Sequence, residues 1–438
     1  MLKAFRGAFL DFIDDPFYVP EVDSVRYLAD GLLVIENGKV KDFGPYEELK
    51  DKFAGIDAIA YPNHLILPGF IDTHIHYPQT AMVAAYGEQL LEWLSKYTFP
   101  TEAKFKDKSY AQEIAQIFLE ELLKNGTTTA LVFAAVFPES VEAFFEEAQK
   151  RNLRMIAGKV MMDRNAPDFL LDTAQSSYTE TKALIEKWHK KDRLLYAVTP
   201  RFAITSTDEQ LALAGKLLVE YPDVYLHTHL SENVDEVAFV AALFPQSQGY
   251  LDAYDQAGLV TERSVFAHGV QLTDAEFKRL SEAKSAISFC PTSNLFLGSG
   301  LFKLHKAKST DTPVKVGLGT DVGAGTSFSL LQTANEAYKV VQLQGEKLSA
   351  FKALFLATLG GAKALCLEDK LGNFEIGKEA DFIVIDPKAT TTMALRNENF
   401  PPSTLESFAD SAFAVMMMGD DRAVKATYIM GELAYQAT

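Results

Sequence analysis

The sequence predicts an α/β protein: a (β/α)8, TIM-like barrel with a small β-sandwich domain formed from the N- and C-terminal segments. Three observations support this prediction. Apolar, β-branched runs alternate with amphipathic helical stretches through the middle of the chain, and eight such runs occur. The two ends of the chain instead contain short strand-like runs joined by turn formers. At 438 residues the chain is long enough for a barrel and a smaller second domain.

The eight expected barrel strands lie in the middle of the chain, at residues 64–76, 127–133, 153–162, 194–202, 224–230, 264–270, 285–291 and 314–321. Helical stretches such as 110–125 and 208–221 separate them, with apolar residues at helical spacing. Each connection is long enough for a helical crossover, so the strands should run parallel, and eight is the number that closes this type of barrel. We therefore expect the barrel over residues 66–366.

The flanking segments read differently. Residues 1–65 contain strand-like runs around the turn formers Asn37-Gly38 and Gly44-Pro45, and residues 367–438 contain further such runs with glycine turns. Two β-rich ends around one barrel can pair with each other. We therefore expect one composite β domain from 1–65 and 367–438, which brings the termini together.

Composition excludes several function classes. The net charge of -17 argues against a nucleic-acid partner, because binding a phosphate backbone calls for clustered Lys and Arg. The first residues, MLKAFRGAFLDFIDDP, reach acidic residues before a signal-peptide apolar region forms, and no apolar stretch reaches the roughly 18 residues of a membrane span. We expect a cytoplasmic protein that binds no membrane. Cys290 and Cys366 lack C-x-x-C spacing and are expected to be ordinary core residues.

Polar side chains gather where the predicted barrel strands end, which is where barrel enzymes build their active sites. The first strand ends in His74 and His76, and the fifth ends in His227 and His229. Alternate residues on a strand share a face, so His74 and His76 point the same way. With this histidine content about 0.15 His-x-His pairs are expected by chance, yet two occur, both on predicted strands. Coincidence therefore explains them poorly.

Four other polar groups stand at or just after strand ends: Arg201, Glu232, His268 and Asp321. Three histidines lie away from strand ends and are expected to be structural or solvated: His64, His189 and His305. Neutral imidazoles with a carboxylate suit zinc or iron(II), and a bound metal of this kind lowers the pKa of water toward neutrality. The pattern therefore predicts a hydrolytic metal site. Taken alone, Glu232 is either a substrate-facing acid or a solvated loop acid near a helix N-terminus.

Four motifs in this order, PGFIDTHIH, HTHLSE, FAHGV and GLGTD, resemble those of the amidohydrolase superfamily of metal-dependent barrel hydrolases. The late stretch IGKEADFIVID matches the small sheet domain of that superfamily, so the resemblance spans nearly the whole chain. Within the superfamily, the stretches HIHYPQT, GTTTALVF, MMDRNAPD, TPRF, CPTSNLFLGSGLF and GTDVGAGTSFS are similar to the guanine deaminase family. These extended matches are far more specific than the histidine pairs alone.

The resemblance implies a metal centre. His74, His76, His229 and Asp321 would be ligands, and His268 would face the hydrolytic water and bind the metal weakly. Some relatives hold two metals bridged by a carbamylated lysine at the end of strand four. Here that strand ends in TPRF with no lysine, so one Zn²⁺ per subunit is expected, or Fe²⁺, and Lys159 on strand three is expected to be structural.

The resemblance also implies a guanine pocket and a homodimer. The expected substrate-binding residues are His76, Gln79, Arg201, Phe202, His229, Glu232 and Asp321. Gln79 and Arg201 would hydrogen-bond the purine edge, and Phe202 would pack on the ring. The catalytic residues would be Glu232, His268 and Asp321: activated water attacks C2 of guanine, Asp321 or His268 takes its proton, and Glu232 protonates N3. Ammonia leaves and xanthine remains.

Three alternatives stay open from the sequence. Another amidohydrolase acting on an adenine-like, cytosine or triazine compound would share the metal centre, so Gln79, Arg201 and Phe202 must discriminate. A non-catalytic barrel scaffold predicts eroded ligand positions, and none of them is eroded. A cytidine-deaminase type of zinc site is disfavoured because its P-C-x-x-C signature is missing, and Cys290-Pro291 has the wrong order.

Overall fold

The computed structural model describes residues 2–87 and 89–437. Two compact units make up the chain. One comprises residues 1–71, 121–128 and 329–438, and the other comprises residues 72–120 and 129–328. The domain boundaries given above, at residues 66 and 366, stay a prediction.

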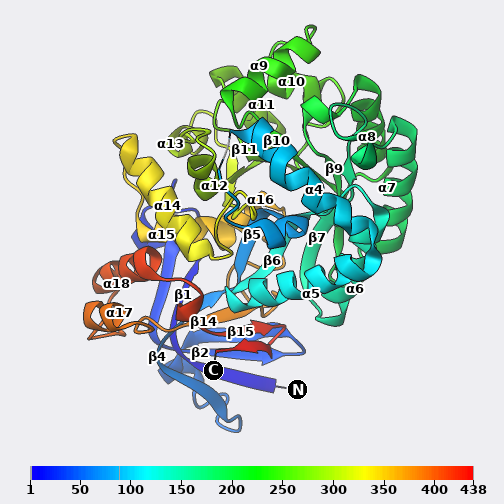
Figure 1. The fold of residues 1–438 in the computed structure, drawn as a ribbon. Coiled ribbons are helices and arrows are strands. Elements are labelled where there is room, and N and C mark those ends of the chain that lie inside the picture. Colours follow the sequence, from blue (N-terminus) through cyan, green and yellow to red (C-terminus); the bar gives the residue numbers. More distant parts are fainter. Residues whose placement is uncertain (1, 88, 438) are drawn as a thin grey trace. The chain divides into compact units, whose positions relative to one another are not determined.

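Eight parallel strands form the barrel sheet, in the order β13-β12-β11-β10-β9-β7-β6-β5 (Figure 1). They are β5 (Phe70–His76), β6 (Thr127–Phe133), β7 (Arg154–Gly158), β9 (Leu195–Pro200), β10 (Tyr225–Leu230), β11 (Ser264–His268), β12 (Ala286–Phe289) and β13 (Lys315–Leu318). A short strand, β8 (Val160–Met161), also pairs with β9. The two ends of the sheet meet where the Thr73 hydroxyl donates to the Leu318 carbonyl at 2.9 Å and the Asp321 amide donates to the His74 carbonyl at 2.9 Å. The sheet therefore nearly closes, and the predicted barrel is confirmed.

Helices on the outer side of the strands bury the second face of the sheet. In Figure 1, α6, α7 and α8 lie along β6, β7 and β9. All residues of β6 and β7 are buried, as expected for parallel strands covered on both faces. The helices of this region are α6 (Pro138–Lys150), α7 (Ala174–Trp188), α8 (Asp208–Glu220), α9 (Val234–Leu243), α10 (Tyr250–Asp255), α11 (Asp274–Ala283), α12 (Pro291–Phe296) and α13 (Leu304–Ala307). Among the residues that the structure describes, none of the helices combines the length and apolarity needed to cross a bilayer.

A long insertion follows β5 before the helix α5 (Lys108–Lys124). It consists of short helical turns: η1 (Tyr77–Met82), α3 (Leu90–Trp93), η2 (Leu94–Thr98), α4 (Phe99–Glu102) and η3 (Ala103–Lys106). Tyr77 anchors it in two ways. Its ring stacks on that of Phe144 in α6, with the ring centroids 5.2 Å apart, and its hydroxyl donates a hydrogen bond of 2.6 Å to the Ser140 carbonyl. The insertion thus supplies side chains beside the carboxyl end of β5.

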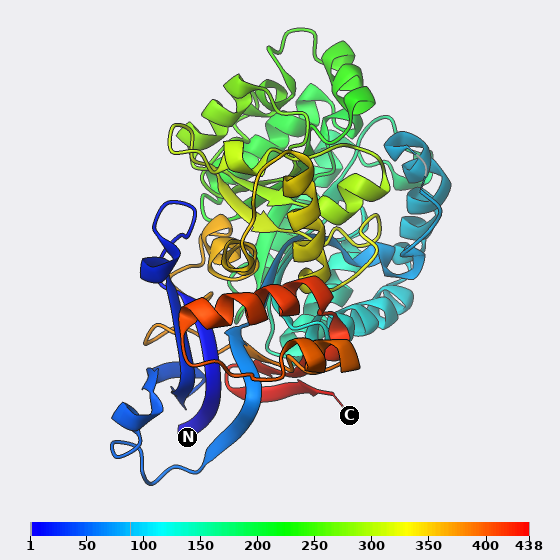
Figure 2. The ribbon, with the colours of Figure 1, turned by 90° about the vertical axis from the view of Figure 1, so that its left-hand side faces the viewer.

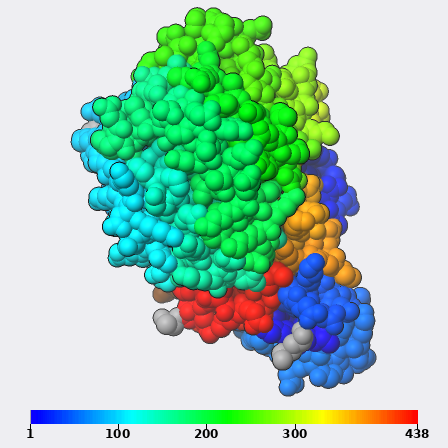
Figure 3. Space-filling model, turned by 90° about the vertical axis from the view of Figure 1, so that its right-hand side faces the viewer, coloured from blue at the N-terminus to red at the C-terminus, as the bar shows by residue number. Residues whose placement is uncertain are grey.

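The N- and C-terminal segments build one seven-stranded mixed sheet in the order β16-β15-β14-β4-β1-β2-β3. Its strands are β1 (Leu2–Phe12), β2 (Val25–Glu36), β3 (Lys39–Pro45), β4 (Ala58–Pro68), β14 (Phe382–Ile385), β15 (Val424–Ile429) and β16 (Glu432–Gln436). Figure 2 shows the N-terminal strands beside the C-terminal ones, and their surfaces adjoin in Figure 3. The N- and C-terminal segments thus share one mixed β-sheet, as the predicted fold class requires.

This sheet curls around an aromatic core. Phe5 on β1 contacts Phe382 on β14 and Tyr428 on β15, with ring centroids 4.8 and 5.0 Å apart, although β15 stands three places from β1 in the sheet. The β2–β3 hairpin turns at Asn37-Gly38, whose φ angles of 53° and 80° are those such a two-residue turn requires. The helices of this unit are α1 (Glu21–Ser24), α2 (Tyr46–Leu49), α14 (Leu330–Leu343), α15 (Ala350–Leu356), α16 (Leu359–Ala364), α17 (Thr391–Arg396) and α18 (Leu405–Met418).

Two predicted strands are divided in the structure: 153–162 forms β7 and β8, and 64–76 is shared between the two sheets. Residues 64–76, expected as a single strand, belong to β4 of the seven-stranded sheet up to Pro68 and to β5 of the barrel from Phe70 onward. Gly69 lies at the junction, where its amide donates to the Asp381 carbonyl at 3.0 Å. A Cβ on Gly69 would lie 2.1 Å from Oγ1 of Thr128. The close approach of β6 therefore requires glycine where the chain leaves one sheet for the other.

Candidate metal centre and substrate pocket

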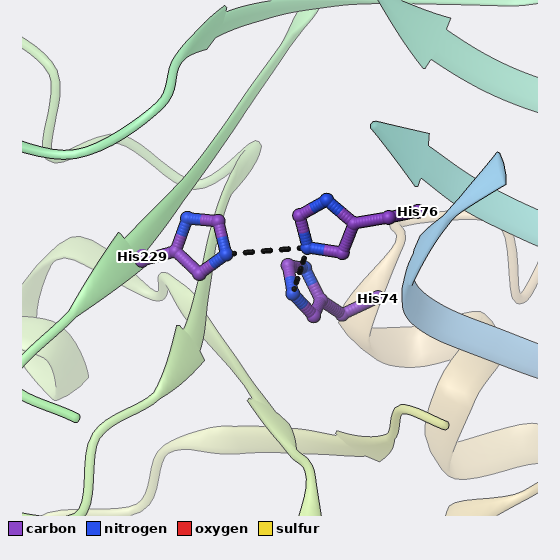
Figure 4. A group of neighbouring side chains, drawn as sticks. All are labelled: His74, His76 and His229. Atoms are coloured by element: carbon purple, nitrogen blue, oxygen red, sulfur yellow. Dashed lines mark hydrogen bonds between the residues drawn. The ribbon is translucent and has the colours of Figure 1, made fainter. Parts of the chain in front are cut away.

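Three imidazoles converge at the carboxyl ends of β5 and β10. Nε2 of His76 lies 3.1 Å from Nε2 of His74 and 3.3 Å from Nε2 of His229 (Figure 4). His74 and His76 share a face of β5 because they are two residues apart, and β10 brings His229 to them across the barrel. One nitrogen atom from each of the three rings lies within 4.8 Å of the other two, which is close enough for the rings to share one metal ion.

A carboxylate completes the cluster. Oδ1 of Asp321, three residues beyond β13, lies 3.1 Å from Nε2 of His74 and 3.2 Å from Nε2 of His76. Ligands held 2.0–2.1 Å from a tetrahedral zinc ion are about 3.3 Å apart. Four of the six separations between these donor atoms, each measured to His74 or His76, therefore match one such ion. His268 is more distant, with its Nε2 3.8 Å from Oδ2 of Asp321.

Burial sets the charge of these donors. It lowers the pKa of His74, lowers that of His76 to about 3, and lowers that of His229 well below the usual range. Burial alone would raise the pKa of the Asp321 carboxyl, but the neighbouring His74 and the other imidazoles lower it well below its usual value. At neutral pH the cluster thus offers three neutral imidazoles and one carboxylate, the forms that bind zinc or iron(II).

Hydrogen bonds on the far side of the rings orient the donor atoms. Nδ1 of His229 donates to the Arg201 carbonyl at 2.7 Å, so the lone pair of this neutral ring is on Nε2 and faces the cluster. Nδ1 of His74 lies 2.7 Å from Nε2 of His227. If Nε2 of His74 is a ligand, its Nδ1–H donates to His227. Partners of this kind fix the tautomer of ligating histidines.

Two of the site residues have unusual backbone conformations. His268 and Asp321 have φ angles of 76° and 51°, which non-glycine residues rarely adopt and which cost on the order of 1 kcal/mol each or more. His268 is held by its Nδ1–H, which donates to Oδ1 of Asn294 at 2.9 Å, and this bond leaves the lone pair on the inward Nε2. Strained positions of this kind cluster at functional sites.

Asp72 ties the strands that carry the ligands. Its Oδ1 accepts from the amides of His74 and Thr320 at 3.1 Å each, and its Oδ2 accepts from the Thr320 hydroxyl at 2.5 Å. Burial raises the pKa of Asp72 to about 7 despite these bonds. The side chain therefore fixes the residue before Asp321 against the end of β5.

Glu232 lies two residues beyond the end of β10, beside His268. It is buried, its Oε1 accepts from the Ser299 hydroxyl at 3.0 Å, and its Oε2 lies 3.5 Å from Nε2 of His268. Burial, and then the charge of Asp321, raise the pKa of Glu232 to about 8, so it carries a proton at neutral pH. The Glu232 amide donates to Oε2 of Glu236 at 2.7 Å, within the capping box that begins α9.

A cavity of about 390 Å³ opens beside the cluster. Its walls are mainly apolar, and all of its lining residues belong to the unit of residues 72–120 and 129–328. The lining residues are His76, Gln79, Leu90, Trp93, Leu94, Arg201, Phe202, His229, Glu232, His268, Leu297, Asp321 and Ala324. The space suits a flat heterocycle presented to the donor atoms.

Two polar residues of the cavity share one buried partner. Glu102, at the end of α4, accepts from Nη1 of Arg201 at 2.8 and 3.0 Å and from Nε2 of Gln79 at 3.1 Å. The guanidinium also lies 5.6 Å from the centre of the Phe99 ring. Because a buried guanidinium is costly without a partner, this ion pair accounts for the position of Arg201.

All of the residues expected from the sequence gather here: the cavity is lined by each of them except His74, which is buried behind it. Besides Asp72, sequence reasoning gave no role to four side chains that hold this site: Glu102, His227, Asn294 and Ser299. His227 had a signal, since it forms half of a His-x-His pair. The other three lie in irregular segments or short helices, far along the chain from their partners, and carry no local pattern.

Comparison with known proteins agrees with this geometry. Residues 65–434 match the amidohydrolase family. The guanine deaminase of Escherichia coli is 57% identical over 439 residues, covering 99% of this chain and 98% of that protein. A solved structure of E. coli guanine deaminase superposes with a TM-score of 0.94 over the full length of both chains, at 55% identity.

A guanine deaminase from C. acetobutylicum, solved with guanine bound in its active site, is 30% identical. It superposes with a TM-score of 0.89 over 99% of this chain and 100% of that chain. The family match covers most of the chain, and the similarity to individual members extends over nearly its whole length. The chain therefore belongs to the amidohydrolase family.

Proposed function

We propose that this protein hydrolyses guanine to xanthine and ammonia. The observation that carries the proposal is the convergence of three Nε2 atoms and one carboxylate oxygen, with neighbouring donor atoms 3.1–3.3 Å apart, beside a cavity that Glu232 also lines. The choice of guanine is supported by the guanine deaminases named above, which this chain resembles over nearly its whole length.

The metal is proposed to be one Zn²⁺ per chain, with Fe²⁺ as the alternative. His74, His76, His229 and Asp321 would hold it, and His268 would bind it weakly. Such a cation supplies Lewis-acid activation of the attacking water near neutral pH. The chain at the end of β9 reads TPRF, without the lysine that would bridge a second metal, so a single ion is expected.

The purine is held by residues of the cavity wall. Arg201 and Gln79 carry the donors and acceptors for the polar edge of guanine, and Phe202 packs on the ring. Arg201 and Gln79 are both buried, each with an exposed fraction of 2%. A ligand that left the free hydrogen-bonding groups of Arg201 and Gln79 unpaired would bind more weakly. The cavity therefore favours a substrate that pairs with both side chains.

Two sets of residues move the protons. Glu232 delivers a proton to ring N3 so that charge does not accumulate on the base during attack at C2. Asp321 and His268 take the proton of the attacking water and pass it to the exocyclic nitrogen. Nitrogen then leaves as ammonia, and C2 carries an oxygen.

The test is ammonia release from guanine, adenine, cytosine and a triazine by the purified protein, with its metal content determined by elemental analysis. Turnover of guanine with formation of xanthine is expected, and the other three compounds should react at least 100-fold more slowly, about 2.7 kcal/mol in transition-state free energy. Preference for one of the other compounds would overturn the proposal in favour of another amidohydrolase activity. No turnover of any compound by metal-replete protein would favour a non-catalytic barrel.

The resemblance to the guanine deaminase family further suggests a cytoplasmic homodimer that acts in guanine breakdown. Sedimentation of the purified protein at several concentrations tests the dimer, which should persist on dilution.

A further inference from the structure

Both ends of the Gln79 side-chain amide are held by the protein. Its Nε2 donates to Oε1 of Glu102 at 3.1 Å, and its Oε1 accepts from the Gly323 amide at 3.2 Å. A backbone N–H can only donate, and the carboxylate beside the permanently charged Arg201 acts as an acceptor. Exchanging the amide nitrogen and oxygen would therefore place two donors against each other at Gly323 and two acceptors against each other at Glu102.

Glu102 itself stays outside the cavity. Its exposed fraction is 0%, and the cavity is lined by its two partners, Gln79 and Arg201. Both carboxylate oxygens accept from Nη1 of Arg201, so one buried side chain sets the direction of the guanidinium and of the amide together. Any influence of Glu102 on a ligand must therefore pass through these two residues.

The fixed orientation matters because a side-chain amide that can rotate offers either its N–H donor or its oxygen acceptor to the same ligand atom. One Nε2–H and one lone pair of Oε1 remain on Gln79 for a ligand. An amide free to turn over can complement the lactam edge of guanine, where O6 accepts and N1–H donates, and equally an edge with a 6-amino donor and an N1 acceptor. An amide held in one orientation complements only one of them in a given pose.

We propose that Glu102 is a specificity-determining positioning residue, which locks the Gln79 amide in the orientation that accepts a lactam edge and rejects an amidine edge. This inference rests on the proposed guanine deaminase function. It assigns to a buried carboxylate outside the cavity lining a part in the discrimination between 6-oxo and 6-amino purines.

The discriminating substrate is 2,6-diaminopurine, which keeps the reacting 2-amino group of guanine and changes only the other edge. Water would replace its 2-amino group, releasing ammonia and leaving 6-amino-2-oxopurine. We would measure kcat/KM for guanine and for 2,6-diaminopurine with wild-type protein and with Glu102→Gln. The neutral amide introduced at residue 102 can present either a donor or an acceptor to Gln79, so the lock is lost. The substrate ratio, kcat/KM for guanine divided by kcat/KM for 2,6-diaminopurine, should fall by about tenfold or more.

Glu147→Gln is the matched control. Glu147 is likewise a buried carboxylate that accepts from a glutamine, Gln112 at 2.7 Å, and from an arginine, Arg151 at 2.7 Å, but it lies outside the cavity lining. Its loss should lower stability and leave the substrate ratio at the wild-type value. A ratio that falls equally in both variants would overturn the proposal, because general loosening of the barrel would then explain it.

Glu102→Asp serves if the glutamine variant does not fold, since it keeps a negative charge for Arg201 but withdraws the carboxylate from Gln79. The ratio should fall here as well, and an unchanged ratio in either folded variant overturns the proposal. In a Gln79→Ala background, changing Glu102 should have no further effect on the ratio. A further fall would overturn the proposal, because Glu102 would then set the ratio through Arg201 and not through the Gln79 amide. If wild-type protein releases no ammonia from guanine, the proposed function itself fails, which is a separate outcome.

Discussion

The imidazoles of the site show how hydrogen bonds to the outer nitrogens prepare the inner ones. The carbonyl of Arg201 can only accept, so Nδ1 of His229 must carry the proton and Nε2 faces the cluster. His227 has the corresponding position behind His74, at 2.7 Å. Burial lowers the pKa of His227 well below its usual range, so it is neutral and can accept a hydrogen bond. In the His227/His229 pair, His229 thus faces the cluster, and His227 supports the ligand His74 from behind.

Replacing His227 tests this supporting role. His227→Leu removes the acceptor behind His74 and leaves a buried N–H unpaired, so zinc affinity should fall about 10- to 100-fold. His227→Gln keeps an acceptor and should retain most of the affinity. Competition with a coloured chelator measures both variants without using activity. If the leucine variant bound zinc as tightly as wild type, His227 would not support the metal centre.

Replacing Glu232 separates the proton donor from the metal ligands. Glu232→Gln keeps the size and the contact with Ser299 but cannot deliver a proton. Metal content should stay at the wild-type level, and kcat for guanine should fall by about 100- to 10,000-fold. The measurement is steady-state xanthine formation together with elemental analysis. A variant that kept its turnover would require another residue as the acid.

At the scale of residues, the sequence predicts those side chains that stand in a strand pattern and misses those that act across the chain. His74, His76, His229 and Asp321 follow apolar runs, and a strand end in a barrel points to the active site. Glu102 contacts Gln79 and Arg201, which are 23 and 99 residues away in the sequence. No local periodicity encodes such a pairing, because it depends on how the insertion after β5 folds back.

At the scale of elements, the junction of β4 and β5 differs from its sequence-based prediction. Residues 65–71 are apolar, and buried strands of both sheets have the same composition, so the residue types do not separate the two strands. Only Gly69 marks the division, and its reason is the contact with Thr128 of β6. A glycine required by a neighbouring strand cannot be recognised before that neighbour is placed.

The junction makes a prediction for stability. Gly69→Ala would put a Cβ 2.1 Å from Oγ1 and 2.5 Å from Cγ2 of Thr128, so β6 or the junction must shift. The free energy of unfolding in urea should fall by about 1–3 kcal/mol. Gly55→Ala is the control, because a Cβ there has nothing within 4 Å, and its effect should stay within about 0.5 kcal/mol. Equal effects of the two substitutions would contradict this account of the junction.

The contact between α5 and α6 makes a prediction for pH. Burial alone would raise the pKa of Glu147, but hydrogen bonds from Lys150, Gln112 and Arg151 outweigh it and lower the pKa from 4.5 to about 2. A folded-state pKa below the unfolded one means that this carboxylate stabilises the fold fully above pH 4.5 and that the contribution is lost as pH falls toward 2. Glu147→Gln should therefore lower the melting temperature more at pH 7 than at pH 3. An equal loss at both pH values would show that ionisation of Glu147 does not contribute.

At the scale of the whole molecule, strand count and the contrast between the middle and the ends of the chain were sufficient to predict the architecture. The alternation from residue 127 onward reproduces β6 to β13 because each strand is covered on both faces and reads as an apolar run. The hairpin at Asn37-Gly38 was predictable from its turn residues. The strand order of the composite sheet was not, since the pairing of β4 with β14 joins residues more than 300 apart along the chain.

The central claim is that one divalent cation, held by residues from β5, β10 and the segment after β13, enables guanine hydrolysis. The most direct measurement is to remove metal from the protein with a chelator, add back Zn²⁺ in steps, and follow xanthine formation. Activity should be lost on removal and should rise linearly to a plateau at one equivalent of Zn²⁺ per chain. Activity that survives chelation, or that reaches its plateau only at two equivalents, would contradict the account.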